Sequence, residues 1–299
     1  MAHLSDFLTP EEVTKLDSLQ LTSRELMEGF IAGMHRSPHK GFSIEFAQHR
    51  PYVQGDDIRR LDWKVYGKTG RNYVREYEEE TNLRAHLLVD LSGSMAYAGE
   101  GRPTKARLAS KVAAALSYLF LNQRDAVGLV TFDTEIRSLI PARTSNRHLS
   151  IILNELGNAE PGGETDLGGV LETLVPRLPR RGVVILISDL FGDIAATIKA
   201  LAHFRLAHHE VILFHILDRD EVEFPFDHWT RFDSMEVPEQ FRLVDTAHFR
   251  SAYLANLRQF QEELKQGCQR HRMECVPIMN DESMAEVLAK FLLRRREKR

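Results

Sequence analysis

The sequence is poor in cysteine, with only Cys268 and Cys275 among its 299 residues. Two cysteines form neither a disulfide framework nor a cysteine-rich zinc site, and such sparse use is typical of a reducing cytosol. The sequence also lacks an uninterrupted apolar run near the ~20 residues that a membrane-spanning helix needs. Its first residues lack the basic and apolar pattern of a signal peptide. We therefore expect a cytoplasmic protein without a membrane span.

An excess of positive charge is also absent. The formal net charge is -4 at pH 7 and the isoelectric point is near 6.4, whereas dedicated nucleic-acid binders normally carry a basic excess. The basic tail of residues 294–299 is interpreted as a solvated helix end rather than a site for RNA or anionic lipid, because the rest of the chain is not basic. We expect no nucleic-acid partner.

From residue 84 onward, apolar runs of strand length alternate with helical stretches, which predicts βαβ units and a mainly parallel sheet. The predicted strands cover residues 85–89, 126–132, 136–140, 183–187, 210–216 and 273–278. The predicted helices cover residues 105–121, 147–156, 167–178, 194–204, 247–271 and 283–294. The third strand follows the second after a short turn, so it should run antiparallel at an edge. The expected fold class is doubly wound α/β.

Two segments depart from this alternation. Residues 1–80 are predicted to form an N-terminal extension, partly helical and partly irregular, that packs on a core domain of residues 81–299. Residues 221–245 interrupt the core domain with aromatic residues, prolines and acids. We expect this segment to be an irregular insertion or a small hairpin over one edge of the sheet.

Oxygen-bearing side chains follow several of the predicted strands. Asp90 ends the first strand, and Ser92 and Ser94 follow it in what should be a tight turn. Asp189 lies just after the strand at residues 183–187, and Thr165 lies in a glycine-rich loop that opens a helix. Ligands of open α/β sheets bind beyond the carboxyl ends of the strands. The five side chains should therefore meet at one edge, where oxygen ligands suit a hard divalent cation, magnesium before zinc.

A structural interpretation of the same turn stays open. Asp90, Ser92 and Ser94 would then cap the turn itself or the helix that begins near Lys105. A scaffold whose site holds no metal is a further alternative that residue types alone do not exclude.

The spacing Asp90-x-Ser92-x-Ser94, followed by Thr165 and Asp189, resembles the metal-ion-dependent adhesion site of von Willebrand factor A domains. The resemblance implies that these residues hold Mg²⁺ or Mn²⁺ directly or through water, with the second aspartate usually acting through water. It also implies an open position on the ion that a carboxylate of a partner protein completes. Glu164 departs from the family pattern, in which a small residue more often precedes the threonine. Three interpretations stay open: it ligates the ion, tightens the binding of the ion, or points outward.

An upstream block narrows the resemblance. Its motifs are Arg50-Pro51-Tyr52, Gly55-Asp56-Asp57-x-Arg59, Leu61-Asp62-Trp63 and Arg75-x-Tyr77-x-x-Glu80-Thr81. Together with the metal motif, they are similar to the bacterial domain-of-unknown-function family fifty-eight, over about residues 34–291. Members of that family carry a von Willebrand A-like half and typically accompany AAA ATPases of the MoxR class. The resemblance implies an adaptor that works with such an ATPase on a client protein, in remodelling or maturation.

Part of this block forms a second candidate cluster, made of Asp56, Asp57, Arg59, Asp62 and Trp63. One interpretation is a docking surface for a partner or a second site. The other is an ion-pair and aromatic cluster that clamps the N-terminal segment to the sheet. Buried charges persist only when they are paired, and the stretch supplies both signs, which favours the structural interpretation.

The alternative function is a magnesium-dependent hydrolase, such as a phosphatase with Asp90 as the nucleophile. Phosphoryl transfer needs charge clamps and a general acid or base near the ion. The position two residues after the nucleophile is Ser92 rather than an aspartate, and no lysine or histidine stands at the predicted strand ends. The sequence also has no Gly-x-x-x-x-Gly-Lys loop for ATP. We therefore expect a non-enzymatic interaction module.

Overall fold

The structure of the chain is a computed structural model that describes residues 2–18, 44–53, 61–79, 83–179, 181–236 and 239–297. The chain divides into two compact units, Met27–Asn82 and a larger unit made of Met1–Leu26 with Leu83–Arg299. The predicted extension of residues 1–80 is thus divided between the two units, and its packing on the core stays a prediction.

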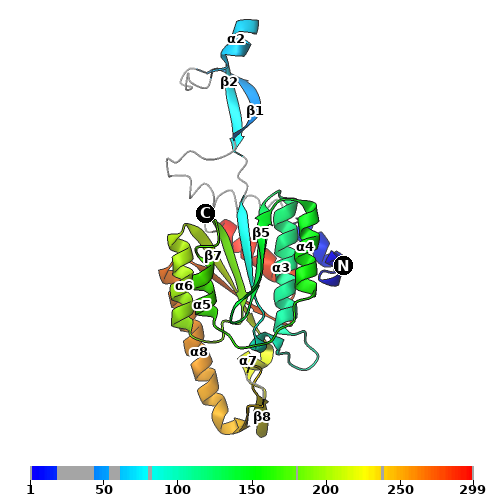
Figure 1. Cartoon of the computed structure of the whole chain (residues 1–299), viewed down its shortest axis with the longest axis vertical. Helices are drawn as coiled ribbons and strands as arrows, with labels where there is room; N and C mark the ends of the chain where they lie inside the picture. The colour runs from blue at the N-terminus through cyan, green and yellow to red at the C-terminus, as the bar shows by residue number, and fades with distance from the viewer. Residues whose placement is uncertain are drawn as a thin grey trace. The chain divides into compact units, whose positions relative to one another are not determined.

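The larger unit is built on a sheet of six strands in the order β10-β7-β6-β3-β4-β5 (Figure 1). They are β3 (Arg84–Asp90), β4 (Ala126–Phe132), β5 (Ile136–Arg143), β6 (Gly182–Ser188), β7 (His209–Leu217) and β10 (Glu274–Met279). Neighbouring strands pair in parallel, apart from β5, which runs antiparallel to β4 at the edge. All the predicted strands are confirmed, as is the antiparallel edge. The strand order reverses between β3 and β6, which is where doubly wound sheets bind ligands.

Helices cover both faces of this sheet, which confirms the predicted doubly wound α/β class. The helices are α3 (Lys105–Asn122), α4 (Asn146–Gly157), α5 (Leu167–Leu174), α6 (Ile194–Leu206), α8 (Thr246–Arg270) and α9 (Met284–Glu297). Helix α3 contacts α4 and α9 on one face, and α6 contacts α5 and α8 on the other. Among the described residues, no helix combines the length and the apolar character that crossing a membrane requires.

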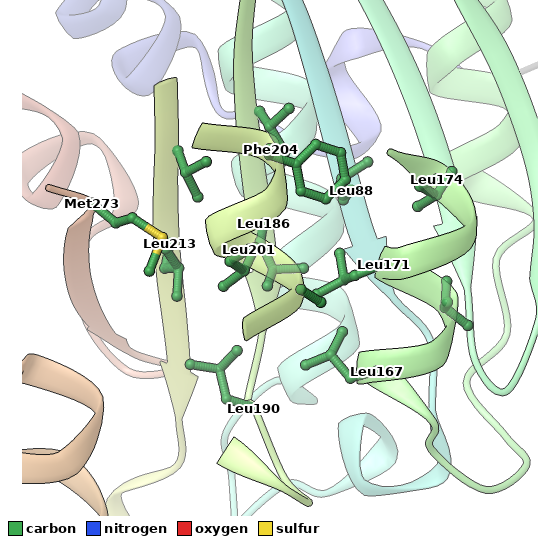
Figure 2. Close-up of a cluster of buried hydrophobic side chains, with 14 of the residues drawn as sticks. Leu88, Leu167, Leu171, Leu174, Leu186, Leu190, Leu201, Phe204, Leu213 and Met273 are labelled. Atoms are coloured by element: carbon green, nitrogen blue, oxygen red, sulfur yellow. The ribbon is translucent and has the colours of Figure 1, made fainter. Parts of the chain in front are cut away.

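The core on the α5–α6 face explains why the central strands read as continuous apolar runs. Leu88, Leu186 and Leu213 lie in register on β3, β6 and β7, and they pack with Leu171 of α5 and Leu201 of α6 (Figure 2). All residues of β6 are buried. A strand that is covered by helices on both faces loses the apolar–polar alternation of a half-exposed strand. The apolar runs therefore locate the strands well but do not say which face each side chain occupies.

The smaller unit contains a hairpin that the sequence pattern did not predict. Strands β1 (Ile44–Pro51) and β2 (Tyr73–Glu79) pair antiparallel, and helix α2 (Trp63–Thr69) lies between them in the sequence. The register shifts between Phe46 and Gln48. Polar residues occupy both sets of alternate positions in these strands, so the apolar–polar alternation of a half-buried strand is missing.

The insertion near residues 221–245 is a short helix followed by a hairpin. Helix α7 (Arg219–Glu223) follows β7, and strands β8 (Trp229–Asp233) and β9 (Phe241–Asp245) pair antiparallel. Figure 1 shows α7 and β8 beyond the end of the sheet at which the parallel strands terminate. The expected small hairpin is thus present, at the carboxyl ends of the strands.

Two leucines of α6 provide a test of the core. Leu201 is fully buried in the cluster of Figure 2, whereas Leu206 on the same helix is 76% exposed. We expect Leu201→Ala to lower the free energy of unfolding by about 2–5 kcal/mol, because it removes buried methyl groups and leaves a cavity. Leu206→Ala should change it by less than about 0.5 kcal/mol. Urea denaturation measures both, and equal losses would contradict this packing.

Two buried histidines predict a loss of stability in acid. His86 and His209 are both buried, with ring centroids 6.3 Å apart, and burial lowers the pKa of each to about 4. The unfolded chain, with histidine pKa values near 6.5, binds more protons than the folded chain between about pH 6.5 and 4. The free energy of unfolding should therefore fall as the pH falls through this window, by about 1.4 kcal/mol per pH unit for each histidine.

Denaturation profiles measured from pH 4 to pH 7 check this expectation. The double variant His86→Leu, His209→Leu should show a flatter profile than the wild type. His248→Asn is the control, because the His248 side chain is 90% exposed, and it should keep the wild-type slope. A double variant with an unchanged slope would assign the acid sensitivity to other groups.

Candidate metal centre

Asp90 lies at the carboxyl end of β3 and is fully buried. Its Oδ1 accepts a hydrogen bond from the backbone N–H of Ser92 at 2.9 Å, and its Oδ2 accepts one from the Ser188 hydroxyl at 2.5 Å. The hydroxyl oxygens of Ser92 and Ser94 are 3.2 Å apart. The turn after β3 thus presents one carboxylate and two hydroxyl groups at the same place.

Asp189 joins this group from the neighbouring strand. Strands β3 and β6 are parallel and pair through Val89 and Ile187, so Asp189 leaves the sheet beside Asp90. The Asp189 carboxylate accepts hydrogen bonds from Ser94 and from Phe191 N–H. The predicted convergence of four of the five side chains at one sheet edge is therefore present as a connected hydrogen-bond network.

Thr165 is attached to the same place through the backbone. Gly93 N–H donates to the carbonyl oxygen of Gly163 at 2.9 Å, and Gly162 N–H donates to that of Leu91 at 2.9 Å. The Thr165 hydroxyl itself donates to Glu236 Oε1 at 2.9 Å. Its loop lies against the Ser92–Ser94 turn, but its side chain is directed to a carboxylate that the sequence did not identify.

Glu164 precedes Thr165 and is exposed. The next residue in the loop, Asp166, caps α5 by accepting a hydrogen bond from Gly169 N–H at 3.0 Å. Of the three interpretations of Glu164, the outward-pointing one agrees with its exposure in this structure.

A buried lysine controls the charge of the site. The Lys105 side chain is 2% exposed, and its ammonium group donates to Asp189 at 2.7 Å and to Glu221 at 2.5 Å. Burial opposes ionisation of Asp189, but the Lys105 charge outweighs it, so the pKa of Asp189 is lowered. Burial, with the Asp189 charge next in importance, raises the pKa of Asp90 to about 6. Within the described part of the chain, Asp90 is therefore a buried carboxylate without a paired cation, whereas the neighbouring Asp189 has Lys105.

The residues present fit a hard divalent cation. The donors gathered here are the carboxylates of Asp90 and Asp189 and the hydroxyl groups of Ser92 and Ser94, with Thr165 on the adjoining loop. All are oxygens, which suit magnesium or manganese rather than softer ions. In the part of the chain that the structure describes, no three His, Cys, Asp or Glu side chains are grouped as metal ligands, so a zinc site has no ligand set there.

The structural interpretation gave Asp90 two possible roles, in capping its own turn or in capping the helix that begins near Lys105, and the structure shows the first but not the second. Asp90 does hold its own turn, through the bond from Ser92 N–H. It does not cap α3, because Thr104 occupies that position and accepts a hydrogen bond from Arg107 N–H at 3.1 Å.

The second candidate cluster is described only in part. Asp62 caps α2, because its Oδ1 accepts hydrogen bonds from the N–H groups of Lys64 and Val65 at 2.9 and 3.3 Å. Trp63 is 62% exposed. The role of Asp62 at the helix end is structural, and the choice of interpretation for the whole cluster stays open. Its other members lie outside the described residues: Asp56, Asp57 and Arg59.

Four residues at the site were not predicted from the sequence. They are Lys105, Ser188, Glu221 and Glu236. Ser188 could have been identified from the sequence, because it directly precedes Asp189 at the end of a predicted strand. The expectation concerned lysines at the strand ends only, and Lys105 escaped it because it reaches Asp189 from the start of helix α3.

A cavity of about 350 Å³ adjoins the site between β7 and α8. Asp189 and Glu221 are on its wall, together with aromatic residues that include Phe191 and Tyr253. His215 also lines it, with Nε2 3.1 Å from the carbonyl oxygen of Asp189, and burial lowers the pKa of His215 to about 4. The imidazole is therefore neutral at pH 7.

Comparison with known proteins identifies a family. A family model described as "Protein of unknown function DUF58" matches residues 48–263. Uncharacterized protein Mb1516 of Mycobacterium bovis and uncharacterized protein Rv1480 of Mycobacterium tuberculosis are each 31% identical to the chain over 225 residues. Each match covers 74% of this chain and 69% of the relative.

Two solved structures are more distantly similar. The conserved hypothetical protein BatB from Bacteroides thetaiotaomicron is 12% identical with a TM-score of 0.42, over 72% of this chain and 99% of BatB. The SpRpn10 VWA domain is 12% identical with a TM-score of 0.40, over 70% of this chain and 95% of the domain.

Two lysines on α3 test the ion-pair arrangement. Lys105→Met would leave the carboxylates of Asp189 and Glu221 without their cation, and we expect it to lower the free energy of unfolding by about 3 kcal/mol. Lys111 pairs with Glu12 and its side chain is 28% exposed, so Lys111→Met should cost less than about 1 kcal/mol. Urea denaturation of metal-free protein distinguishes the two. A Lys105→Met loss no larger than that of Lys111→Met would contradict a buried, paired ammonium.

Proposed function

We propose that this chain, which belongs to the family described as protein of unknown function DUF58, is a non-enzymatic protein-interaction module that depends on a divalent metal. The observation that carries the proposal is the pairing of charges at the sheet edge. Asp189 has Lys105 as its cation, whereas Asp90 is fully buried and no cation among the described residues pairs with it. A buried carboxylate in this state, beside hydroxyl oxygens, favours the binding of a metal cation.

Five residues would hold the metal: Asp90, Ser92, Ser94, Thr165 and Asp189. When bound, Mg²⁺ or Mn²⁺ supplies positive charge and an open coordination position for an oxygen ligand. The network already holds the hydroxyl groups of Ser92 and Ser94 together, so little rearrangement of that turn is needed. The negative charge of Asp189 is already balanced by Lys105, so Asp189 is suited to contact the metal through a water molecule rather than directly.

The binding partner that this chemistry fits is an acidic side chain of another protein. A carboxylate completes the shell of a hard cation, and the cavity beside Asp189 offers apolar contact next to it. The family resemblance supports a narrower proposal, in which the chain is an adaptor for a MoxR-type AAA ATPase that remodels or matures a client protein in the cytoplasm.

A magnesium-dependent hydrolase with Asp90 as the nucleophile is the second candidate, and the presence of Lys105 favours it at first sight. The Lys105 ammonium is 2% exposed and already bonded to two carboxylates, so it is not free to clamp a phosphate. Burial lowers the pKa of His215 to about 4, so at pH 7 it is not the imidazolium that a general acid requires, and its Nε2 lies 3.1 Å from the carbonyl oxygen of Asp189. The positions of both residues support the interaction module over the hydrolase.

Substitution of Asp90 tests the metal dependence. Asp90→Asn keeps the shape of the side chain but removes the charge that attracts the cation, so the affinity for Mn²⁺ should fall at least tenfold, about 1.4 kcal/mol. The signal of free Mn²⁺ in electron paramagnetic resonance measures the affinity, and circular dichroism confirms the fold. Asp193→Asn is the matched control, because Asp193 lies in the loop after β6 but caps α6, a role that asparagine also fills.

The partner is tested by capture from native cytosol with wild type and Asp90→Asn, each with Mg²⁺ and with chelator. We expect an ATPase to be retained by wild type with Mg²⁺ and lost in the other three conditions. Equal retention in all four would place the contact away from the metal site. A wild type that binds no Mn²⁺, or a variant that binds it as well as wild type, would refute the proposal.

A further inference from the structure

The turn between β8 and β9 lies on the candidate metal centre. The two strands pair from Trp229 with Asp245 to Asp233 with Phe241, and the tip that follows places Glu236 at the Thr165 hydroxyl, 2.9 Å from Oγ1. This bond joins residues that are 71 positions apart in the chain. The tip therefore reaches the loop that carries one of the five candidate ligands.

A second contact brings the backbone of the tip to the other loop. A Cβ atom added at Gly93 would overlap the carbonyl oxygen of Met235. Gly93 lies between Ser92 and Ser94, so the tip packs directly on the turn that presents both candidate hydroxyl ligands. The absence of a side chain at Gly93 is what permits this approach.

The base of the hairpin is held more firmly than its tip. At the base, Thr246 is fully buried, and both its hydroxyl and its N–H donate to the carbonyl oxygen of His228, at 2.5 and 3.3 Å. At the other end, Phe241 in the last pair before the turn is 57% exposed, and Met235 in the tip is 44% exposed. A two-stranded hairpin with exposed side chains has little stability of its own. Its tip is therefore able to leave the site while its base stays attached.

We propose that Glu236 is an internal carboxylate that occupies the place of the partner's acidic side chain, so that the β8–β9 hairpin closes the site until an external carboxylate displaces it. This inference rests on the proposed function. It assigns to the hairpin a regulatory role, because an external carboxylate must compete with one that is covalently part of the chain. The apparent affinity for the partner is reduced by the fraction of molecules in which the site is closed.

The test uses the full chain loaded with Mn²⁺ and acetate as the carboxylate probe. Acetate that binds the ion displaces exchangeable water, which lowers the water-proton relaxation rate. We expect the acetate concentration for half of this effect to be at least threefold lower in Glu236→Gln than in wild type, because the internal competitor has lost its charge. Sodium chloride at matched ionic strength gives the background.

Glu239→Gln is the matched control. Glu239 lies in the same turn and is exposed, so the substitution makes the same change of charge without touching Thr165, and it should behave as wild type. Hydrogen exchange of residues 229–236 is the second readout. In Mn²⁺-loaded protein, the hairpin of Glu236→Gln should exchange at least threefold faster than that of wild type. In metal-free protein the two should match, because a glutamine side chain still accepts the bond from Thr165.

The outcomes separate this inference from the proposed function. If wild type binds Mn²⁺ in an Asp90-dependent way, but Glu236→Gln has the acetate response and hairpin exchange of wild type, the hairpin is not a competitor and this inference alone is overturned. An equal change in Glu236→Gln and Glu239→Gln would also overturn it, because the effect would then be one of general charge. If wild type binds no Mn²⁺, both proposals fall.

Discussion

The buried ion pairs of Lys105 are the interaction on which the rest of the site depends. Its ammonium group, 2% exposed, bonds to Asp189 at the end of β6 and to Glu221 in α7. A buried charge is tolerated only when it is paired, so the start of α3, the sheet edge and the insertion are held together at this point. The same contact divides the roles of the two aspartates: Asp189 is paired with Lys105, and none of the cations that the structure describes pairs with Asp90. The demand for a further cation is thereby concentrated at Asp90.

The sheet and the convergence at its edge were predictable because both follow from local patterns. Strands that are buried on both faces give continuous apolar runs, and parallel strands bring the residues after their carboxyl ends to one edge. These two patterns were sufficient to predict that Asp90 and Asp189 lie at the same edge of the sheet. The hairpin of β1 and β2 was missed because its strands have no apolar–polar alternation, and the cluster that includes Asp62 could not be assigned from composition.

The remaining site residues were hidden for a different reason. Lys105 meets Glu221 across 116 positions of the chain, and Thr165 meets Glu236 across 71. Neither pair has a spacing that sequence reasoning recognises, since each depends on where an insertion after β7 folds back. A lysine at a helix start ordinarily indicates solvent exposure, so nothing in the sequence marks Lys105 as a buried partner of the strand-end carboxylate.

The insertion at residues 221–245 contacts the site through two interactions of different strength. Glu221 is bonded to a buried ammonium group at the base of the insertion, and separating these charges would leave Lys105 with one fewer partner in a place that water does not reach. Glu236 at the tip is half-buried and bonded to a neutral hydroxyl group. A hydrogen bond to a charged group contributes about 1.5–3 kcal/mol, less than the cost of about 3–5 kcal/mol of breaking a buried ion pair. A competing carboxylate would therefore displace the tip while the base stays in place, so that the site opens without losing the charge arrangement that attracts the cation.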